Sequence, residues 1–112
     1  MIDANSAVRI ILNTLDVKVT YYHPQEFNKL PCISYYELTT TTGMRYDNEE
    51  QAQCSNMQID VWGKGGGEIS RIAVDVDRVM QADGWFRELS RDMPPENNIF
   101  HKTMRFSKQI FF

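Results

Sequence analysis

The segment from Gln53 to Trp62 contains the pattern that most restricts how this chain can fold. Apolar and polar side chains alternate there, in the order Met57, Gln58, Ile59, Asp60, Val61, Trp62. Alternation with a period of two residues is typical of a strand that has one face on a core and the other face away from it. The segment therefore predicts a half-buried strand in which Asp60 points away from the core, towards solvent or an interface.

A glycine-rich segment and an amphipathic pattern follow this strand. An apolar stripe at helical spacing consists of Ile69, Ile72, Ala73, Val76, Val79 and Met80. It predicts a helix that begins at Glu68 and is stopped by Gly84. Residues 63–67 lie where a phosphate-binding loop would lie, but they lack its Gly-Lys-Ser/Thr ending, so we interpret them as a hinge.

The other segments complete an α+β pattern. Val8, Ile11, Leu12 and Leu15 share one face of a predicted N-terminal helix that ends near Asp16. Strand composition marks five segments, namely residues 17–22, 32–42, 53–62, 85–92 and 99–112. We predict a loop at 25–29, an exposed hairpin connection from Gly43 to Gln51, and a turn with two prolines at 93–98.

The order α-β-β-β-α-β-β predicts an α+β fold. In this fold an antiparallel or mixed β-sheet is packed on one face by two helices. A length of 112 residues suits one domain, and we place residues 1–112 in a single domain. No run of eighteen apolar residues is present, so no membrane-spanning segment is predicted.

The net charge and the two cysteines exclude few classes of function. Twelve basic and fifteen acidic residues give a net charge of −3, which provides no excess positive charge for binding nucleic acid. Cys32 and Cys54 both lie in predicted strands and could face each other across a sheet. Free thiols are the favoured interpretation for a chain in a reducing compartment.

Side chains that carry chemistry are few and separated. His23 and His101 have no ligand partner at metal-binding spacing, and His23 is interpreted as a turn residue. Asp60, Glu37 and Asp75 are the candidates for a small metal-dependent nuclease, if folding brings these carboxylates together. The leading prediction is that the protein is not an enzyme and has no catalytic residue, metal site or cofactor.

Aromatic side chains provide the candidate interface residues. A tyrosine pair in a strand, such as Tyr21-Tyr22 or Tyr35-Tyr36, sends one ring to each face of the sheet. Exposed aromatic rings on a sheet often anchor protein partners, whereas helices or loops could instead cover both faces. On the first interpretation Tyr36 and Trp62 are interface candidates. Basic residues do not cluster around these rings, which disfavours binding of single-stranded nucleic acid.

Several motifs in a fixed order give the chain a resemblance. Leu30-Pro31-Cys32-Ile33-Ser34-Tyr35 begins a strand with a proline, and Gln58-Ile59-Asp60-Val61-Trp62-Gly63 closes one with a tryptophan. A glycine-rich hinge, an amphipathic helix, a short strand and Lys102-Thr103-Met104-Arg105-Phe106 follow. This order resembles the tail-completion (tail-terminator or head–tail joining) proteins of long-tailed phages and prophages. The similarity covers most of residues 1–112, and the stretch QIDVWGK is its most specific part.

The resemblance implies a structural role in a virion. It implies a homo-oligomeric ring, usually a hexamer, between the head connector or stopper protein and the tail tube protein, with DNA only as passing cargo and no contact with a membrane. The particle would be assembled in the cytoplasm of the host bacterium. The projecting hairpin would consist of Met44, Arg45, Tyr46, Asp47, Asn48, Glu49 and Glu50. An alternative hypothesis is a head-completion or other minor capsid subunit.

Overall fold

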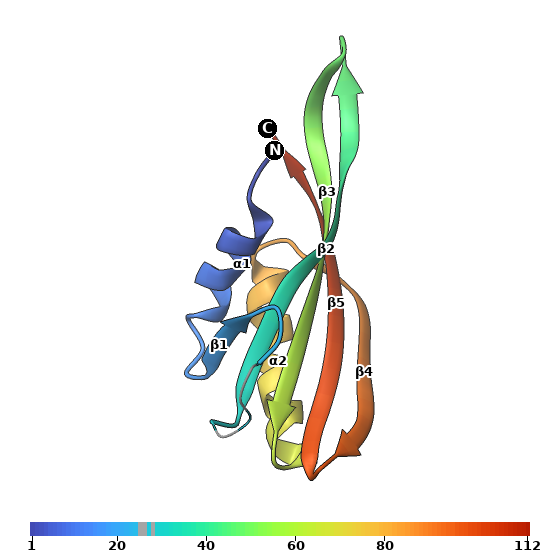
Figure 1. The fold of residues 1–112 in the computed structure, drawn as a ribbon. Coiled ribbons are helices and arrows are strands. Elements are labelled where there is room, and N and C mark those ends of the chain that lie inside the picture. The colour runs from blue at the N-terminus through green and yellow to red at the C-terminus, as the bar shows by residue number, and fades with distance from the viewer. Residues whose placement is uncertain (25–26, 28) are drawn as a thin grey trace.

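A computed structural model describes residues 1–24, 27 and 29–112 and confirms the predicted α+β fold (Figure 1). Residues 25, 26 and 28 of the predicted loop lie outside the described residues. The elements follow the predicted order: α1 (Ala4–Leu12), β1 (Lys18–Tyr21), β2 (Cys32–Tyr46), β3 (Glu49–Gly63), α2 (Gly66–Ala82), β4 (Phe86–Glu96) and β5 (Ile99–Phe111). Neither helix in these ranges is long and apolar enough to cross a membrane.

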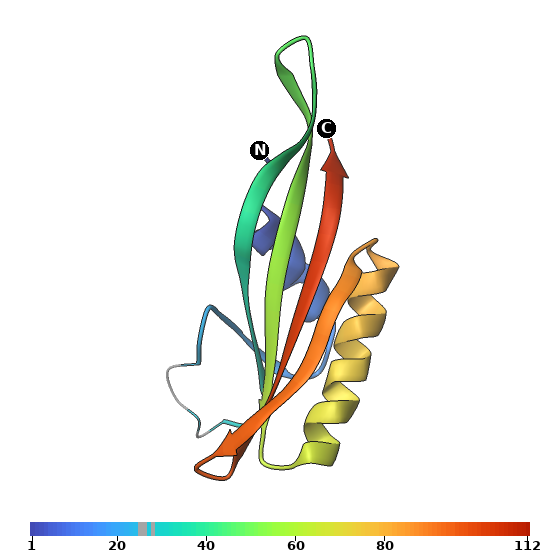
Figure 2. The same ribbon diagram turned by 90° about the vertical axis from the view of Figure 1, so that its right-hand side faces the viewer.

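The five strands form one mixed sheet in the order β1-β2-β3-β5-β4. β1 and β2 run parallel, and the other neighbouring strands are antiparallel. Figure 1 shows both helices on the same side of the sheet, and Figure 2 shows β2, β3, β5 and β4 side by side in this order. One sheet face is therefore covered by helices, and we call the other the helix-free face.

The core lies between the sheet and the two helices. The alternating residues Met57, Ile59 and Val61 of β3 are fully buried there, as the sequence predicts. The buried stripe of α2 consists of Ile69, Ile72, Ala73, Val76 and Met80, and the buried positions of α1 are Ala4, Val8 and Leu12. Burial of each large apolar side chain contributes about 1.5–3 kcal/mol, so this interface is the main source of stability.

The helix boundaries differ slightly from the prediction. The first helix ends at Leu12 and not near Asp16. The hydroxyl of Thr14 donates to the carbonyl of Ile11 at 2.7 Å, and the backbone continues in tight turns towards β1. α2 begins at Gly66, slightly before the predicted start. It ends at Ala82, and Gly84 takes a φ of 91°, as expected of a glycine stop.

The predicted connection at 43–51 is an exposed hairpin, as expected, but its extent is wrong, because strand pairing continues through most of it. β2 and β3 remain paired up to Tyr46 and Glu49, and only Asp47 and Asn48 form the turn. Both turn residues have positive φ, 53° and 64°, as a two-residue hairpin turn of type I′ requires. Asp and Asn adopt this conformation more readily than other non-glycine residues, so the strands can extend to the tip.

The predicted turn at 93–98 is also wrong in extent. β4 runs through Pro94 and Pro95 to Glu96, and the turn consists of Asn97 and Asn98, with φ of 53° and 62°. Proline cannot donate to a neighbouring strand, but β4 is the outermost strand of the sheet. Prolines on this edge therefore interrupt the sheet little.

Gly63 is required where β3 passes into α2. A Cβ atom at this position would lie 2.7 Å from Cγ2 of Ile69, which is buried, and 2.8 Å from Oε1 of Glu68. We expect Gly63→Ala to lower the free energy of unfolding by about 1–3 kcal/mol, because the first turn of α2 must shift. Urea denaturation measures this change. Gly66→Ala is the control, since a Cβ there meets nothing within 4 Å; equal stability of the two variants would contradict the packing described here.

Candidate functional site

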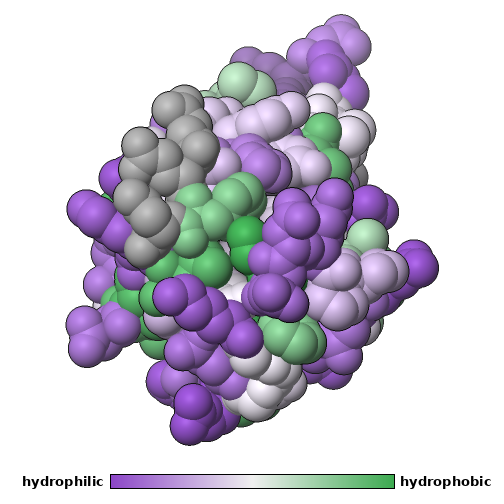
Figure 3. Space-filling view, turned by 60° about the horizontal axis from the view of Figure 1, so that its bottom comes forward, coloured by the Kyte–Doolittle hydropathy of each residue, from purple (hydrophilic) through white to green (hydrophobic). Residues whose placement is uncertain are grey.

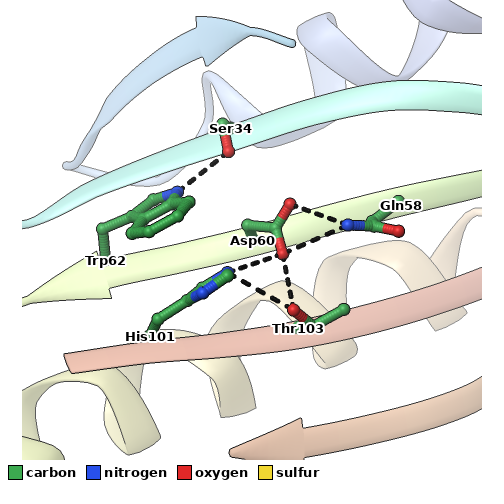
Figure 4. A network of polar contacts seen from close by, with 6 residues as sticks. All are labelled: Ser34, Gln58, Asp60, Trp62, His101 and Thr103. Atoms are coloured by element: carbon green, nitrogen blue, oxygen red, sulfur yellow. Dashed lines mark hydrogen bonds and ion pairs between the residues drawn. The ribbon is translucent and has the colours of Figure 1, made fainter. Parts of the chain in front are cut away.

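Asp60 is the centre of a polar network on the helix-free face (Figure 4). Its carboxylate accepts hydrogen bonds from Thr103 Oγ1 at 2.7 Å and Gln58 Nε2 at 3.1 Å. His101 Nε2 lies 2.8 Å from Asp60 Oδ1, and it must carry the proton because an ionised carboxylate can only accept. Asp60 points away from the core, as predicted, but it is not solvated, since only 4% of the residue is exposed.

The indole of Trp62 is held in place by this network and by the neighbouring strand. Its ring stacks on the imidazole of His101, with centroids 3.7 Å apart and planes 10° apart. Its Nε1–H donates to Ser34 Oγ at 3.0 Å. The rings of His23 and Phe27 contact the same indole, at 5.3 and 5.2 Å between centroids. Trp62 therefore belongs to a rigid, half-buried aromatic cluster.

A recess of about 340 Å³ lies beside this cluster, at the end of the molecule where β4 and β5 meet. It is lined by His23, Phe27, Trp62, Pro94, Glu96, Asn97, Ile99 and His101. Figure 3 shows this end of the molecule, where hydrophobic residues lie among hydrophilic ones. The recess combines aromatic rings with one carboxylate and one amide, a composition that suits a protein side chain better than a highly charged ligand.

Sequence spacing did not identify the pairing of His101 with Asp60. The two residues are far apart in the chain, but Asp60 faces Thr103 across the β3–β5 ladder, and His101 is opposite Trp62. The alternation of β3 and β5 places Asp60, Trp62, His101 and Thr103 on one face. This pairing could have been predicted only if the register between β3 and β5 had been known. His23 lies at a turn, as interpreted, but its ring also contributes to the aromatic cluster.

The tyrosine pairs are divided between the two faces, as predicted. Tyr35 is buried on the helix-covered face and contacts Tyr21, with centroids 5.6 Å apart. Tyr36 is half-buried on the helix-free face and contacts Tyr22 at 4.8 Å. Burial and, to a lesser extent, the nearby charge of Asp60 raise the pKa of Tyr36, so its hydroxyl remains a hydrogen-bond donor at neutral pH.

The β2–β3 hairpin extends beyond the rest of the sheet, as Figure 1 shows. Residues 44–49 are exposed and Glu50 is half-buried. Met44 and Tyr46 expose 48% and 71% of their surface, and both lie on the same projecting element. Arg45 Nη2 donates to the Asn48 carbonyl at 3.0 Å and so fixes the turn. The tip is therefore ordered locally and presents aromatic and aliphatic surface.

The three carboxylates proposed for a nuclease do not converge. Asp60 lies on the helix-free face, whereas Glu37 is opposite Met57 on the helix-covered face. Asp75 is exposed on α2 and lies 3.6 Å from Arg78. In the described part of the chain no group of three metal-ligating side chains comes together. These three carboxylates therefore do not form a common metal-binding site of the kind that the nuclease hypothesis requires.

The two cysteines are free thiols in this structure. Cys32 is buried beside β1 and β3, and Cys54 is half-buried higher on β3. Burial raises the pKa of the Cys32 thiol, and the charge of Lys18 opposes this only in part. Because the thiolate is the nucleophile, Cys32 is an unreactive core residue at neutral pH.

No protein-family model matches this chain, and no curated protein matches it. Its role must therefore be inferred from the two surfaces described above. One is the projecting hairpin, and the other is the helix-free face with its fixed aromatic cluster.

Proposed function

We propose that this chain is a structural subunit of a phage or prophage particle. In this proposal, copies of it form a ring that completes the tail and joins it to the head connector. The ring would be assembled in the cytoplasm of the host bacterium and would remain in the virion. The observation that carries the proposal is the exposed β2–β3 hairpin, which projects beyond the sheet.

An isolated two-stranded ribbon is at best marginally stable in water. The hairpin beyond Met44 is such a ribbon, because β5 pairs with β3 only as far as Ala52 and Phe112 bonds to Gln51. In the described chain this ribbon has no helix against it. It exposes Tyr46 and Met44, which are of the residue types that anchor protein interfaces. A neighbouring subunit or the tail tube would cover these side chains, which makes the hairpin a suitable arm for assembly.

The helix-free face supports the proposal as a second contact surface. Trp62 is fixed by His101 on its face and by Ser34 on its edge. Tyr36 is fixed by Tyr22 on the same side of the sheet. Because these rings are already ordered, a partner that binds them loses little side-chain entropy. A rigid face and a projecting arm together suit a subunit that contacts neighbours on both sides.

The charge of the chain is compatible with a ring through which DNA passes. A net charge of −3 provides few contacts to phosphate groups. DNA that must move through a ring is better served by a surface that does not hold its backbone. The net charge is compatible with this role but does not point to it, and the projecting hairpin is the main basis of the proposal.

Mass measurement by light scattering tests the proposal. The purified protein is measured alone, with the tail-tube protein of the same phage, and with the head connector. We expect a complex that contains several copies of this chain when either partner is present. A protein that stays monomeric and binds neither partner would contradict the proposal.

A further inference from the structure

One edge of the sheet is open along the upper half of β2. The β1 ladder ends where Tyr21 pairs with Tyr35, and the last backbone bond from that side is Tyr22 N to the Tyr35 carbonyl at 2.7 Å. Beyond this point, within residues 1–24, 27 and 29–112, β2 pairs with no strand other than β3, up to Tyr46. Figure 2 shows the outer side of β2 without a neighbouring strand there. These backbone groups can pair with a further strand.

The two open edges of the sheet differ in their protection. Natural proteins use charged residues and prolines in edge strands to prevent these strands from pairing with other chains. The β4 edge contains both kinds, namely Arg87, Glu88, Arg91, Asp92, Pro94, Pro95 and Glu96. The β2 edge from Leu38 to Met44 contains neither, since its sequence is LTTTTGM. Threonine also favours strand pairing, so the β2 edge is the more receptive of the two.

The sequence of this edge is complementary to itself in the antiparallel direction. A two-fold axis at Thr41 would place Glu37 opposite Arg45 of a second copy, and Leu38 opposite Met44 of that copy. At each end of the paired segment, an acidic side chain would then lie opposite a basic one, and an apolar side chain would lie opposite another apolar one. The threonines would face one another or Gly43 in the middle. Cross-strand pairs of these kinds are favourable.

The bulges of β2 are compatible with this register. Bulges of β2 occur between Glu37 and Thr39 and again between Thr42 and Met44, almost symmetrically about Thr41. A third irregularity, between Met44 and Arg45, skips Gln51 of β3 and leaves the alternation of β2 itself unchanged. Each bulge shifts the alternation of side chains once, so two bulges return Glu37 and Arg45 to the same face of the sheet. Side chains that are opposite each other in a paired sheet must share a face, and this condition is met.

The charged residues that would meet have no ion-pair partner in the described part of the chain, and Arg45 Nη2 donates to the Asn48 carbonyl at 3.0 Å. Neither Glu37 nor Arg45 forms an ion pair there, and Oε2 of Glu37 is buried without a hydrogen-bond partner. Leu38 and Met44 expose 38% and 48% of their surface. Pairing of two copies would give the charges partners and would cover the apolar side chains.

We propose that two free copies of this chain pair through the β2 edges from Glu37 to Arg45, antiparallel and around a two-fold axis at Thr41. The two sheets then become one continuous sheet. A two-fold contact of this kind uses the same surface on both copies and closes after two subunits. The pairing concerns the protein before it meets the tail, and it does not rest on the proposed role in a particle.

A charge exchange tests this register. Glu37→Arg and Arg45→Glu each place like charges opposite each other twice, so each variant should weaken the dimer at least about tenfold. The double variant restores both opposite-charge pairs and should dimerise as the wild type does. Sedimentation equilibrium in the absence of any partner measures the dissociation constants of the wild type, the two single variants and the double variant. A monomeric wild type would overturn the proposal, and so would a double variant as weak as the single ones.

Cross-linking tests the position of the axis. Thr41 lies opposite Cys54 of its own chain, so the experiment uses a Cys54→Ser background. Oxidised glutathione, which is reduced as the disulfide forms, should link two copies of the Thr41→Cys variant. Thr39→Cys is the matched control, because its two copies would be offset by four residues, about 13 Å. Equal linking of the two variants, no linking, or growth into rings or fibres would overturn the two-fold pairing.

Discussion

Replacing Asp60 with alanine is expected to lower the free energy of unfolding by about 3 kcal/mol, because a buried charge centre is removed from its partners. The change leaves His101 Nε2, Thr103 Oγ1 and Gln58 Nε2 without their common acceptor. Since small domains are stable by only about 5–15 kcal/mol, a loss of this size is a large fraction of the total. Urea denaturation monitored by tryptophan fluorescence measures it.

Asp60→Asn is the matched control for this prediction. The amide keeps one oxygen that can accept from Thr103 or His101, but it loses the negative charge. We therefore expect a smaller loss of stability than for Asp60→Ala. If both variants unfolded at the same urea concentration as the wild type, the polar network would contribute nothing to the stability of the fold. Trp62 would then have no fixed support from His101.

Shortening the projecting hairpin is expected to abolish assembly while the fold survives. The variant replaces residues 45–51 with Asn-Gly, which joins Met44 to Ala52, residues that are already paired across the sheet. Asn-Gly is favourable in a two-residue turn, and the removed residues contribute no side chain to the buried core. Binding to the tail tube should weaken at least about thirtyfold, because the exposed anchor Tyr46 is lost.

Two measurements separate assembly from stability in this variant. Circular dichroism should show a melting temperature close to that of the wild type, and cosedimentation with tubes should show little bound protein. Val74→Ala, at an exposed position of α2, is the control and should bind tubes normally. A shortened protein that still binds tubes as the wild type does would remove the hairpin from the account.

The sequence predicts those features that arise from local periodicity. The alternation in β3 and the stripe of α2 each identify a buried face, so the fold class and the element order follow from them. The ends of elements are less predictable, because turns depend on single residues. Asn48 and Asn98 end their strands through positive φ, and Pro94 is tolerated only because β4 is an edge strand. Neither fact is visible before the strands are placed.

The candidate site depends on contacts between distant segments, which periodicity does not provide. Asp60 and His101 become partners only when β3 and β5 take one particular register. A shift of that register by one residue would send His101 to the opposite face of the sheet. The aromatic pattern of the strands predicts Trp62 as an interface candidate, but it does not predict the polar network that holds this residue. Three-dimensional pairing was required to find that network.

Electron microscopy of tail tubes mixed with the purified protein tests the central claim most directly. The account predicts a ring of density at one end of each tube, built from several copies of this chain, with the β2–β3 hairpins in contact with a neighbouring subunit or with the tube. Bare tube ends beside unassembled protein, at concentrations where both components are folded, would contradict it.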